Sequence, residues 1–170
     1  TQSRSSAASD VYKRQVQKRT DALLNCGGTH RPEWFHRKLG DILYEGCGVA
    51  RDEAGLLDAL TKVRELREEF WRDVKVVGTG NRLNQELEKA GRVADFIELG
   101  EVMILDALDR RESAGAHFRN EYATEAGEAK RNDGDWCAVS AWETRPDGTK
   151  VRHSEPLSFS LIDLQVRDYR

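Results

Sequence analysis

Apolar residues recur at helical spacing over three stretches of the chain, and the first of these follows Pro32. Proline suits the first turn of a helix, so we expect a helix over residues 32–45. Gly46 and Gly48 then end it. The apolar residues of this stretch form one stripe: Phe35, Leu39, Ile42 and Leu43.

The second stretch begins at Asp52, which is suited to cap a helix N-terminus, with Glu53 in the first turn. Its apolar positions repeat about every 3.5 residues, a period typical of the seam of a helical bundle. The opposite face is charged and is expected to be solvated, with Arg64 and Glu68 four residues apart as a pair. The seam consists of Leu56, Ala59, Leu60, Val63, Leu66, Phe70 and Val74.

The third stretch predicts a long helix over residues 83–113, with Gly115 just past its end as a C-cap glycine. From residue 93 to residue 108 the apolar side chains spread around the whole helix. Such a helix needs cover on every side, so we expect it to dock also against protein outside this bundle. Its main stripe consists of Leu83, Leu87, Ala90, Ala94 and Ile97.

The period changes to two after a polar stretch at residues 122–135. Alternation over residues 136–142, then the turn at 145–148 with Asp-Gly, predicts a β-hairpin that returns through Val151 and His153. The alternation resumes at 157–161, and a shift of phase between Ile162 and Val166 suggests a bulge or bend. The fold class is therefore mainly α, a spectrin-repeat-like three-helix bundle followed by a small β-hairpin tail.

The chain divides into four segments by composition. Residues 1–15 have no apolar core of a signal peptide and read as a non-native, adaptor-derived leader, so the remainder is expected to be part of a longer protein. Residues 16–31 carry little periodicity and are expected to be a linker, with a turn at Cys26-Gly27-Gly28-Thr29. The three-helix bundle is expected over residues 32–121, and the polar loop and hairpin tail over 122–170.

Two glycine pairs raise the possibility of a dinucleotide site. A dinucleotide fingerprint requires GxGxxG between a strand and a helix, but Gly78-Thr79-Gly80 is followed by Leu83 and Gly46-Cys47-Gly48 by Arg51 at the third glycine position. The helix expected after Gly80 runs for about thirty residues without leading to a second parallel strand. We therefore expect Gly78 and Gly80 to let the chain reverse between two antiparallel helices.

Composition narrows the class of protein. The 170 residues are 38% hydrophobic and 34% charged, which fits one folded domain, and the net charge of −3 gives no indication of nucleic-acid binding. No run approaches the roughly 20 apolar residues needed to span a bilayer. The three cysteines, Cys26, Cys47 and Cys137, are far apart and form no CxxC pair, which fits a reducing, cytosolic setting without a zinc site.

Among the residues able to carry chemistry, His117 stands out. It could act as a general base or orient a partner, but a histidine that hydrogen-bonds the last carbonyls of a helix is the favoured interpretation. Ser113 lacks the GxSxG context of a nucleophile, and the other histidines form no metal cluster. A glutamate inside the apolar part of the third helix, Glu98 or Glu101, could pair with a docked surface. We therefore predict no catalytic, cofactor-binding or metal-binding residue.

Longer motifs carry a resemblance. The segment RVADFIELGEVMILDALDRRESAGAHFR at residues 92–119 has an Arg-x-Glu-Ser-x-Gly-x-His-aromatic-Arg string, and an acidic stretch follows that closes on Asp135-Trp136. Upstream lie FHRKLGDILYEGCGVARDEAGLLDAL, LREEFW and NQELEKAGRVADF. In these features the chain from about Glu33 onward resembles the C-terminal region of the flavoprotein subunit of succinate dehydrogenase and fumarate reductase. Many members have arginine where this chain has Ala114, so no role of that arginine is carried over.

The resemblance implies a parent enzyme that binds FAD and interconverts succinate and fumarate. It also implies that electrons pass to an iron–sulfur subunit and then to quinone in a membrane cytochrome b anchor. The expected location is peripheral, on the cytoplasmic side of the inner membrane. The FAD and substrate residues of the family lie upstream of the matching region, so this segment is expected to be structural, inactive alone and prone to self-association.

The predicted interface with the parent's flavin domain involves four residues of the motif: Glu112, Ser113, His117 and Arg119. Two other functions stay open. One is a freestanding three-helix module that binds partner proteins, and the other is the C-terminal domain of a related flavoprotein such as L-aspartate oxidase.

Overall fold

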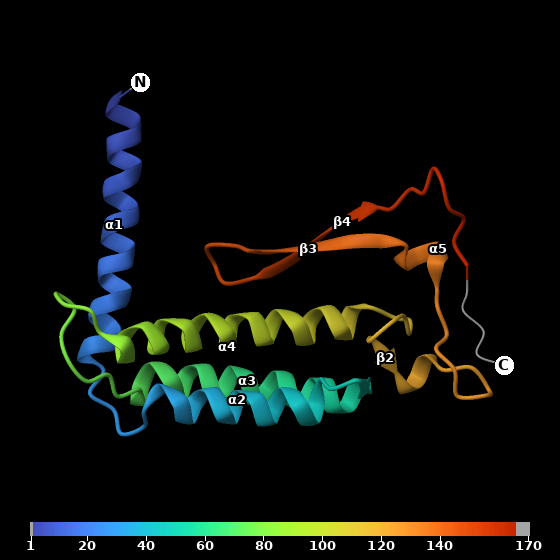
Figure 1. The fold of residues 1–170 in the computed structure, drawn as a ribbon, viewed down its shortest axis with the longest axis horizontal. Helices are drawn as coiled ribbons and strands as arrows, with labels where there is room; N and C mark the ends of the chain where they lie inside the picture. Colours follow the sequence, from blue (N-terminus) through green and yellow to red (C-terminus); the bar gives the residue numbers. More distant parts are fainter. Residues whose placement is uncertain (1, 166–170) are drawn as a thin grey trace. The chain divides into compact units, whose positions relative to one another are not determined.

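The computed structural model describes residues 2–165 (Figure 1). These residues divide into two compact units. The first unit contains the residues up to Tyr44 and Leu60–Glu101, and the second contains Glu45–Ala59 and the chain from Val102 onward. The elements in chain order are α1 (Gln2–Asn25), α2 (Pro32–Gly46), β1 (Ala50–Arg51), α3 (Glu53–Asp73), α4 (Gln85–Asp109), β2 (Phe118–Arg119), the 3-10 helix η1 (Asn120–Tyr122), α5 (Asp133–Trp136), β3 (Ala138–Thr144) and β4 (Lys150–Pro156).

The core of the first unit lies along the predicted seam. Phe35 of α2 and Phe70 of α3 are fully buried and pack edge to face, with ring centroids 5.2 Å apart. Gly100 of α4 lets Leu39 and Leu43 approach closely, since an added Cβ there would lie 3.3 Å from the Leu39 side chain. Burial of each such large side chain contributes roughly 1.5–3 kcal/mol. The predicted fold class, mainly α with a hairpin tail, is confirmed.

The charged face of α3 departs from the prediction in one respect. Arg64 donates to Glu101 of α4, with Nε 2.7 Å from Oε1, and Arg67 donates to Oε2 of the same carboxylate. The Glu101 side chain is only 4% exposed. The expectation that an embedded glutamate such as Glu101 pairs with an external surface was therefore wrong, because its own chain supplies both partners.

Helix α4 is shorter at both ends than predicted. Leu83 is 95% exposed, and the Oδ1 atom of Asn84 accepts the amides of Glu86 and Leu87, so Asn84 caps the helix. The helix ends at Asp109 rather than Ser113. Gly115, with φ of +58°, serves a tight turn further on and not the helix end, because the residues after Asp109 form polar contacts that a helix would prevent.

Helix α1 occupies a segment where the sequence shows little periodicity. Most of its described side chains are exposed, and Leu23 near its end is buried. The absence of an apolar stripe hid this helix from pattern analysis, which found little periodicity over residues 16–31. Whether residues 1–15 are a leader and 16–31 a linker remains a prediction.

Two predicted turns are confirmed in the first unit. An added Cβ on Gly28 would lie 1.9 Å from the carbonyl oxygen of Asp73. Only glycine therefore fits at this position, where the chain passes the end of α3. Between α3 and α4, Gly78 has φ of +101°, and the Asn84 side-chain amide donates to the carbonyls of Val77 and Thr79. The Gly-Thr-Gly segment thus reverses the chain between two helices.

The second unit contains the predicted hairpin. Strands β3 and β4 pair antiparallel from Ala138↔Pro156 to Thr144↔Lys150, and Gly148 at the turn has φ of +85°. Asp106 and Asp109 of α4 hold this hairpin, the first by accepting from Trp142 Nε1 at 2.8 Å and the second by pairing with Arg152 at 2.6 Å. No strand forms over described residues 157–165, where alternation and a bulge were expected, and Val166 lies outside the described residues.

Large apolar side chains remain exposed along α4. Phe96 is 41% exposed and Leu99 is 55% exposed in the first unit, and Met103 is 47% exposed in the second. The sequence placed apolar residues all around this helix, and these positions are the ones its own chain leaves open. That another protein covers them remains a prediction.

Candidate functional site

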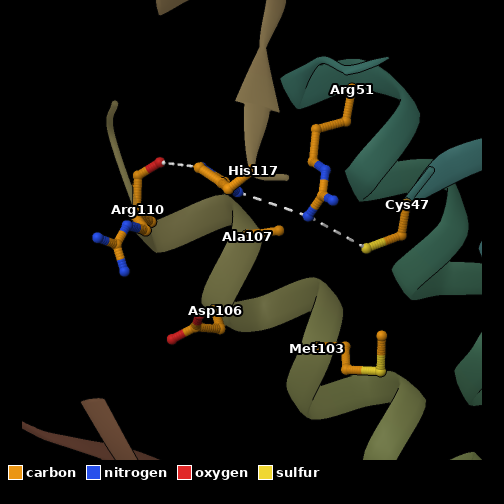
Figure 2. Close-up of a pocket in the computed structure, with 7 residues that line it drawn as sticks. All are labelled: Cys47, Arg51, Met103, Asp106, Ala107, Arg110 and His117. Atoms are coloured by element: carbon orange, nitrogen blue, oxygen red, sulfur yellow. Dashed lines mark hydrogen bonds between the residues drawn. The ribbon is translucent and has the colours of Figure 1, made fainter. Parts of the chain in front are cut away.

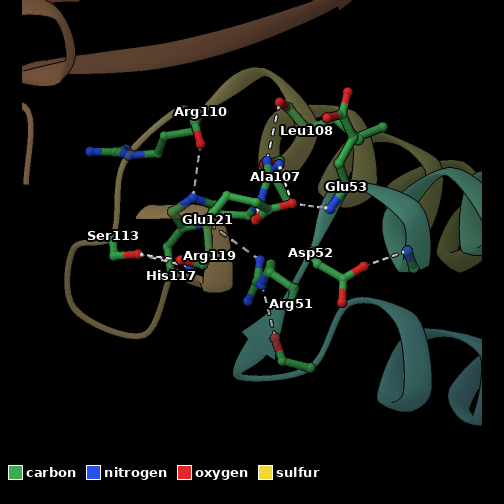
Figure 3. A network of polar contacts seen from close by, with 12 residues as sticks. Arg51, Asp52, Glu53, Ala107, Leu108, Arg110, Ser113, His117, Arg119 and Glu121 are labelled. Atoms are coloured by element: carbon green, nitrogen blue, oxygen red, sulfur yellow. Dashed lines mark hydrogen bonds and ion pairs between the residues drawn. The ribbon is translucent and has the colours of Figure 1, made fainter. Parts of the chain in front are cut away.

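The carboxyl end of α4 meets the Arg-Glu-Ser-Ala-Gly-Ala-His-Phe-Arg segment at Arg119. This guanidinium is almost fully buried, and its Nη1 atom donates to the carbonyls of Ala107 at 2.7 Å and Leu108 at 3.3 Å (Figure 3). The last carbonyls of a helix lack intrahelical partners, and a cation there also favours the helix dipole. Arg119 therefore caps α4.

Glu121 connects Arg119 to the start of α3. Its carboxylate accepts from Arg119 Nε at 3.1 Å and from the backbone amide of Glu53 at 2.5 Å. Burial raises the pKa of Glu121, but the bonds from Arg119 and the Glu53 amide outweigh burial and bring the pKa to about 2. Asp52 caps the same helix by accepting from the amide of Gly55 at 2.8 Å, as predicted.

Ser113 and Glu112 hold the intervening loop. The Ser113 hydroxyl donates to the Arg119 carbonyl at 3.2 Å and accepts the Arg119 amide at 2.8 Å, and it is fully buried. The Glu112 carboxylate accepts from Arg110 Nη2 at 2.6 Å and from the backbone amide of Asn132 at 2.8 Å. Buried polar groups are stable only when they are bonded, and here each has partners within its own chain.

His117 belongs to the same loop, between Ser113 and Arg119. Its Nε2 atom lies 3.1 Å from the carbonyl oxygen of Arg110, so Nε2 must donate. Its Nδ1 atom faces Nη1 of Arg51 at 3.5 Å and must accept, because a guanidinium has no acceptor. Burial lowers the pKa of His117, and the charges of Arg51, Arg110 and Arg119 lower it further. The expected contact of His117 with carbonyls at the helix end is confirmed.

A cavity of about 230 Å³ adjoins His117 (Figure 2). Seven residues line it: Cys47, Arg51, Met103, Asp106, Ala107, Arg110 and His117.

This arrangement stabilises the loop and can bind a ligand, but it does not favour nucleophilic chemistry. The Ser113 hydroxyl is already hydrogen-bonded to the Arg119 backbone. The two ring nitrogens of His117 contact Arg51 and the carbonyl of Arg110. Burial raises the pKa of the Cys47 thiol, which disfavours the reactive thiolate. Among residues 2–165, no three His, Cys, Asp or Glu side chains are placed to hold a metal ion.

The structure brings the four predicted interface residues together. Glu112, Ser113 and Arg119 are buried by their own chain, and His117 is half-buried beside the cavity. Their contact with a second domain remains a prediction.

Sequence reasoning missed Arg51 and Glu121. One signal could have pointed to Glu121, because an Arg-x-Glu or Arg-x-Asp pattern occurs three times in this region and forms an ion pair each time. The pairs are Arg110–Glu112, Arg119–Glu121 and Arg131–Asp133. Arg51 lies 66 positions from His117, and no local pattern signals that contact.

Comparison with known proteins gives the class. Residues 36–169 match the family model described as fumarate reductase flavoprotein C-term, so the class is the helical C-terminal region of a flavoprotein. The chain is 26% identical over 166 residues to the succinate dehydrogenase flavoprotein subunit of Bacillus subtilis, covering 97% of this chain and 27% of that protein. It is 28% identical over 121 residues to the fumarate reductase flavoprotein subunit of Haemophilus influenzae, covering 71% of this chain and 20% of that protein.

The fold also matches a solved structure of Escherichia coli quinol fumarate reductase. The TM-score is 0.78 at 25% identity, covering 92% of this chain and 26% of that chain. The chain therefore belongs to the family of C-terminal domains of succinate dehydrogenase and fumarate reductase flavoprotein subunits. It spans about a quarter of the length of these relatives. No helix in residues 2–165 is long and apolar enough to cross a membrane.

Proposed function

We propose that this domain supports the flavin domain of an enzyme that interconverts succinate and fumarate. The observation that carries the proposal is the buried Arg119 network, which fixes the end of α4 while α4 leaves Phe96 and Leu99 exposed. A rigid helix with uncovered apolar side chains is suited to pack against another folded surface. The parent protein's flavin domain is the proposed surface.

In such a parent protein, the FAD and substrate sites are assigned to the part of the relatives that this chain does not span. The Gly-Thr-Gly loop is unsuited to a dinucleotide phosphate, because the Asn84 side chain fills it. Its Nδ2 atom lies 2.8 Å from the position of an added Cβ on Gly78. Electrons would pass to an iron–sulfur subunit and to quinone through a cytochrome b anchor, with the assembly on the cytoplasmic side of the inner membrane.

The supporting role is tested in a full-length flavoprotein subunit that carries this domain. We expect Arg119→Met to lower the melting temperature and the flavin content together, with turnover per bound flavin unchanged. Arg111→Met is the matched control, since Arg111 is exposed beside the same loop. Loss of turnover per flavin at full flavin content would contradict a supporting role.

The isolated chain provides a second test. We expect the purified 170-residue protein to carry no flavin absorbance and to oxidise no succinate. Stoichiometric flavin in the purified chain would refute the assignment of FAD binding to the rest of the parent protein.

A further inference from the structure

Arg51 differs from the other arginines that are buried or half-buried in the second unit. Each of the others has a carboxylate partner, whereas in the described part of the chain Arg51 contacts only neutral acceptors. The paired arginines are Arg110 with Glu112, Arg119 with Glu121, Arg131 with Asp133, and Arg152 with Asp109.

The contacts of Arg51 leave much of its donor capacity unused. Only Nε makes a short bond, to the carbonyl of Gly48 at 2.8 Å. Nη1 lies 3.5 Å from His117 Nδ1 and 3.8 Å from the Cys47 sulfur, and Nη2 lies 3.5 Å from the carbonyl of Ala116. A guanidinium has five donors and gains most from a carboxylate that accepts two parallel bonds. Among the described residues, no carboxylate accepts from the Nη1 and Nη2 edge of this guanidinium.

The surroundings make this charge costly. Strand β1 pairs parallel with β2 and sets Arg51 opposite Arg119, whose charge Glu121 already balances, so Arg51 is left without a carboxylate among the described residues. A partly buried charge without a counter-ion is unfavourable. The arrangement therefore favours the arrival of an anion.

The cavity beside Arg51 has room for a small anion. Its volume of about 230 Å³ is well above the roughly 10–15 Å³ that a cavity needs to hold one water. Figure 2 shows Arg51 and His117 turned toward each other, with the Asp106 carboxylate and the Arg110 guanidinium directed elsewhere. Those two groups already bond to Trp142 and Glu112, respectively. The guanidinium fork matches a carboxylate through two parallel bonds, and its single charge balances the single charge of a carboxylate.

We propose that Arg51 and His117 form a binding site for a carboxylate. Nη1 and Nη2 of Arg51 donate to the two carboxylate oxygens, which replaces the long contact from Nη1 to the imidazole. Released from that contact, Nδ1 of His117 can take up a proton and donate to the same anion. The carboxylate can belong to a free small acid or to an Asp or Glu side chain of a docked protein.

The site is tested by NMR titration of the whole chain with sodium acetate, with sodium chloride at equal ionic strength as the reference. We expect saturable shifts at Arg51 Nε and the His117 ring, and a higher pKa of His117 in acetate, because the anion stabilises the imidazolium. The groups that face this ring are Cys47, Arg51, Asp106, Arg110 and Arg119. Shifts equal to those in chloride would overturn the proposal.

Two substitutions locate the site. Arg51→Met should abolish the saturable shift of His117, whereas Arg111→Met, at an exposed arginine, should retain it. Arg51→Lys keeps the charge but not the paired donors, and it should weaken acetate binding about tenfold. If circular dichroism shows that Arg51→Met is unfolded, Arg51→Lys replaces it as the test of the site. Unchanged affinity in Arg51→Lys would count against paired donation.

Succinate and N-acetylaspartate methylamide distinguish the two sources. If succinate binds at least about tenfold more tightly than acetate, the site takes a free dicarboxylic acid. If N-acetylaspartate methylamide and succinate bind no more tightly than acetate, the site recognises one carboxylate and the source is a protein side chain. Both outcomes support the site, and the absence of saturation with all three compounds overturns it.

Discussion

Two buried polar clusters, one in each unit, differ in how their charges are balanced. In the first unit, the single carboxylate of Glu101 accepts from Arg64 and Arg67, and those two guanidiniums remain partly exposed to water. In the second unit, Arg119 is buried with helix carbonyls and Glu121, while Arg51 has no carboxylate partner in the described chain. The first cluster is complete within its own unit. The second leaves one charge for a partner.

The largest expected effect is at Arg119. Arg119→Met removes the cap of α4 and leaves Glu121 without its main partner, which should lower the free energy of unfolding by about 3 kcal/mol. Urea denaturation of the chain measures this. A loss below about 1 kcal/mol would show that water replaces the guanidinium and that the second cluster contributes little to stability.

A smaller loss is expected at Glu101. Glu101→Gln keeps the shape but removes the charge that Arg64 and Arg67 share, and the cost should be about 2 kcal/mol because both guanidiniums can reach water. The matched control is Glu88→Gln, at an exposed pair with Arg92 that should contribute less than about 1 kcal/mol. Equal losses at the two positions would remove the distinction between a buried and an exposed pair.

The two clusters should also differ in how their contributions to stability depend on pH. The pKa of Glu121 is about 2 in the folded chain, below its ordinary value of 4.5, so its contribution to stability is present above pH 4.5. That contribution is lost as the pH falls toward 2, because the unfolded chain binds the proton first. Glu121→Gln should flatten the decline of stability in this window, as measured by denaturation at successive pH values. An unchanged decline would assign it to other carboxylates, such as Asp73, whose pKa is also about 2.

The smallest effect on stability is expected on the exposed apolar positions of α4. Leu99→Gln should change the free energy of unfolding by less than about 0.5 kcal/mol, because the side chain is largely in water. It should nevertheless reduce self-association in sedimentation at high concentration. The buried Leu66 provides the contrast, since Leu66→Gln should destabilise the chain strongly. A wild-type chain that stays monomeric would contradict the expected self-association through the exposed apolar side chains of α4.

The spacing of apolar residues predicted the elements that bury one apolar face. Helix α2 spans Pro32–Gly46 against a predicted 32–45, and the hairpin turns at Asp147-Gly148 as expected. Helix α4 was extended too far because residues 110–113 have no helix breaker. What ends the helix there is the burial of Glu112 and Ser113 on partners from distant parts of the loop. Local preference contains no information on those contacts.

The candidate site was predictable only in part. The bond from His117 to a carbonyl at the helix end follows from position, since such carbonyls need donors. The meeting of His117 with Arg51 depends on the parallel pairing of β1 with β2, two residues each, which is too short to give a periodic signal. The Glu121 bond to the start of α3 likewise arises from tertiary folding.

The link through Arg119 and Glu121 also governs how the chain opens locally. Helix termini ordinarily fray one at a time, and their amides exchange with solvent quickly. Here the last carbonyls of α4 and the first amide of α3 share one ion pair. Fraying at either terminus therefore disturbs the other, so the Glu53 and Arg110 amides should exchange with deuterium through a common opening event and be shielded from proteases together.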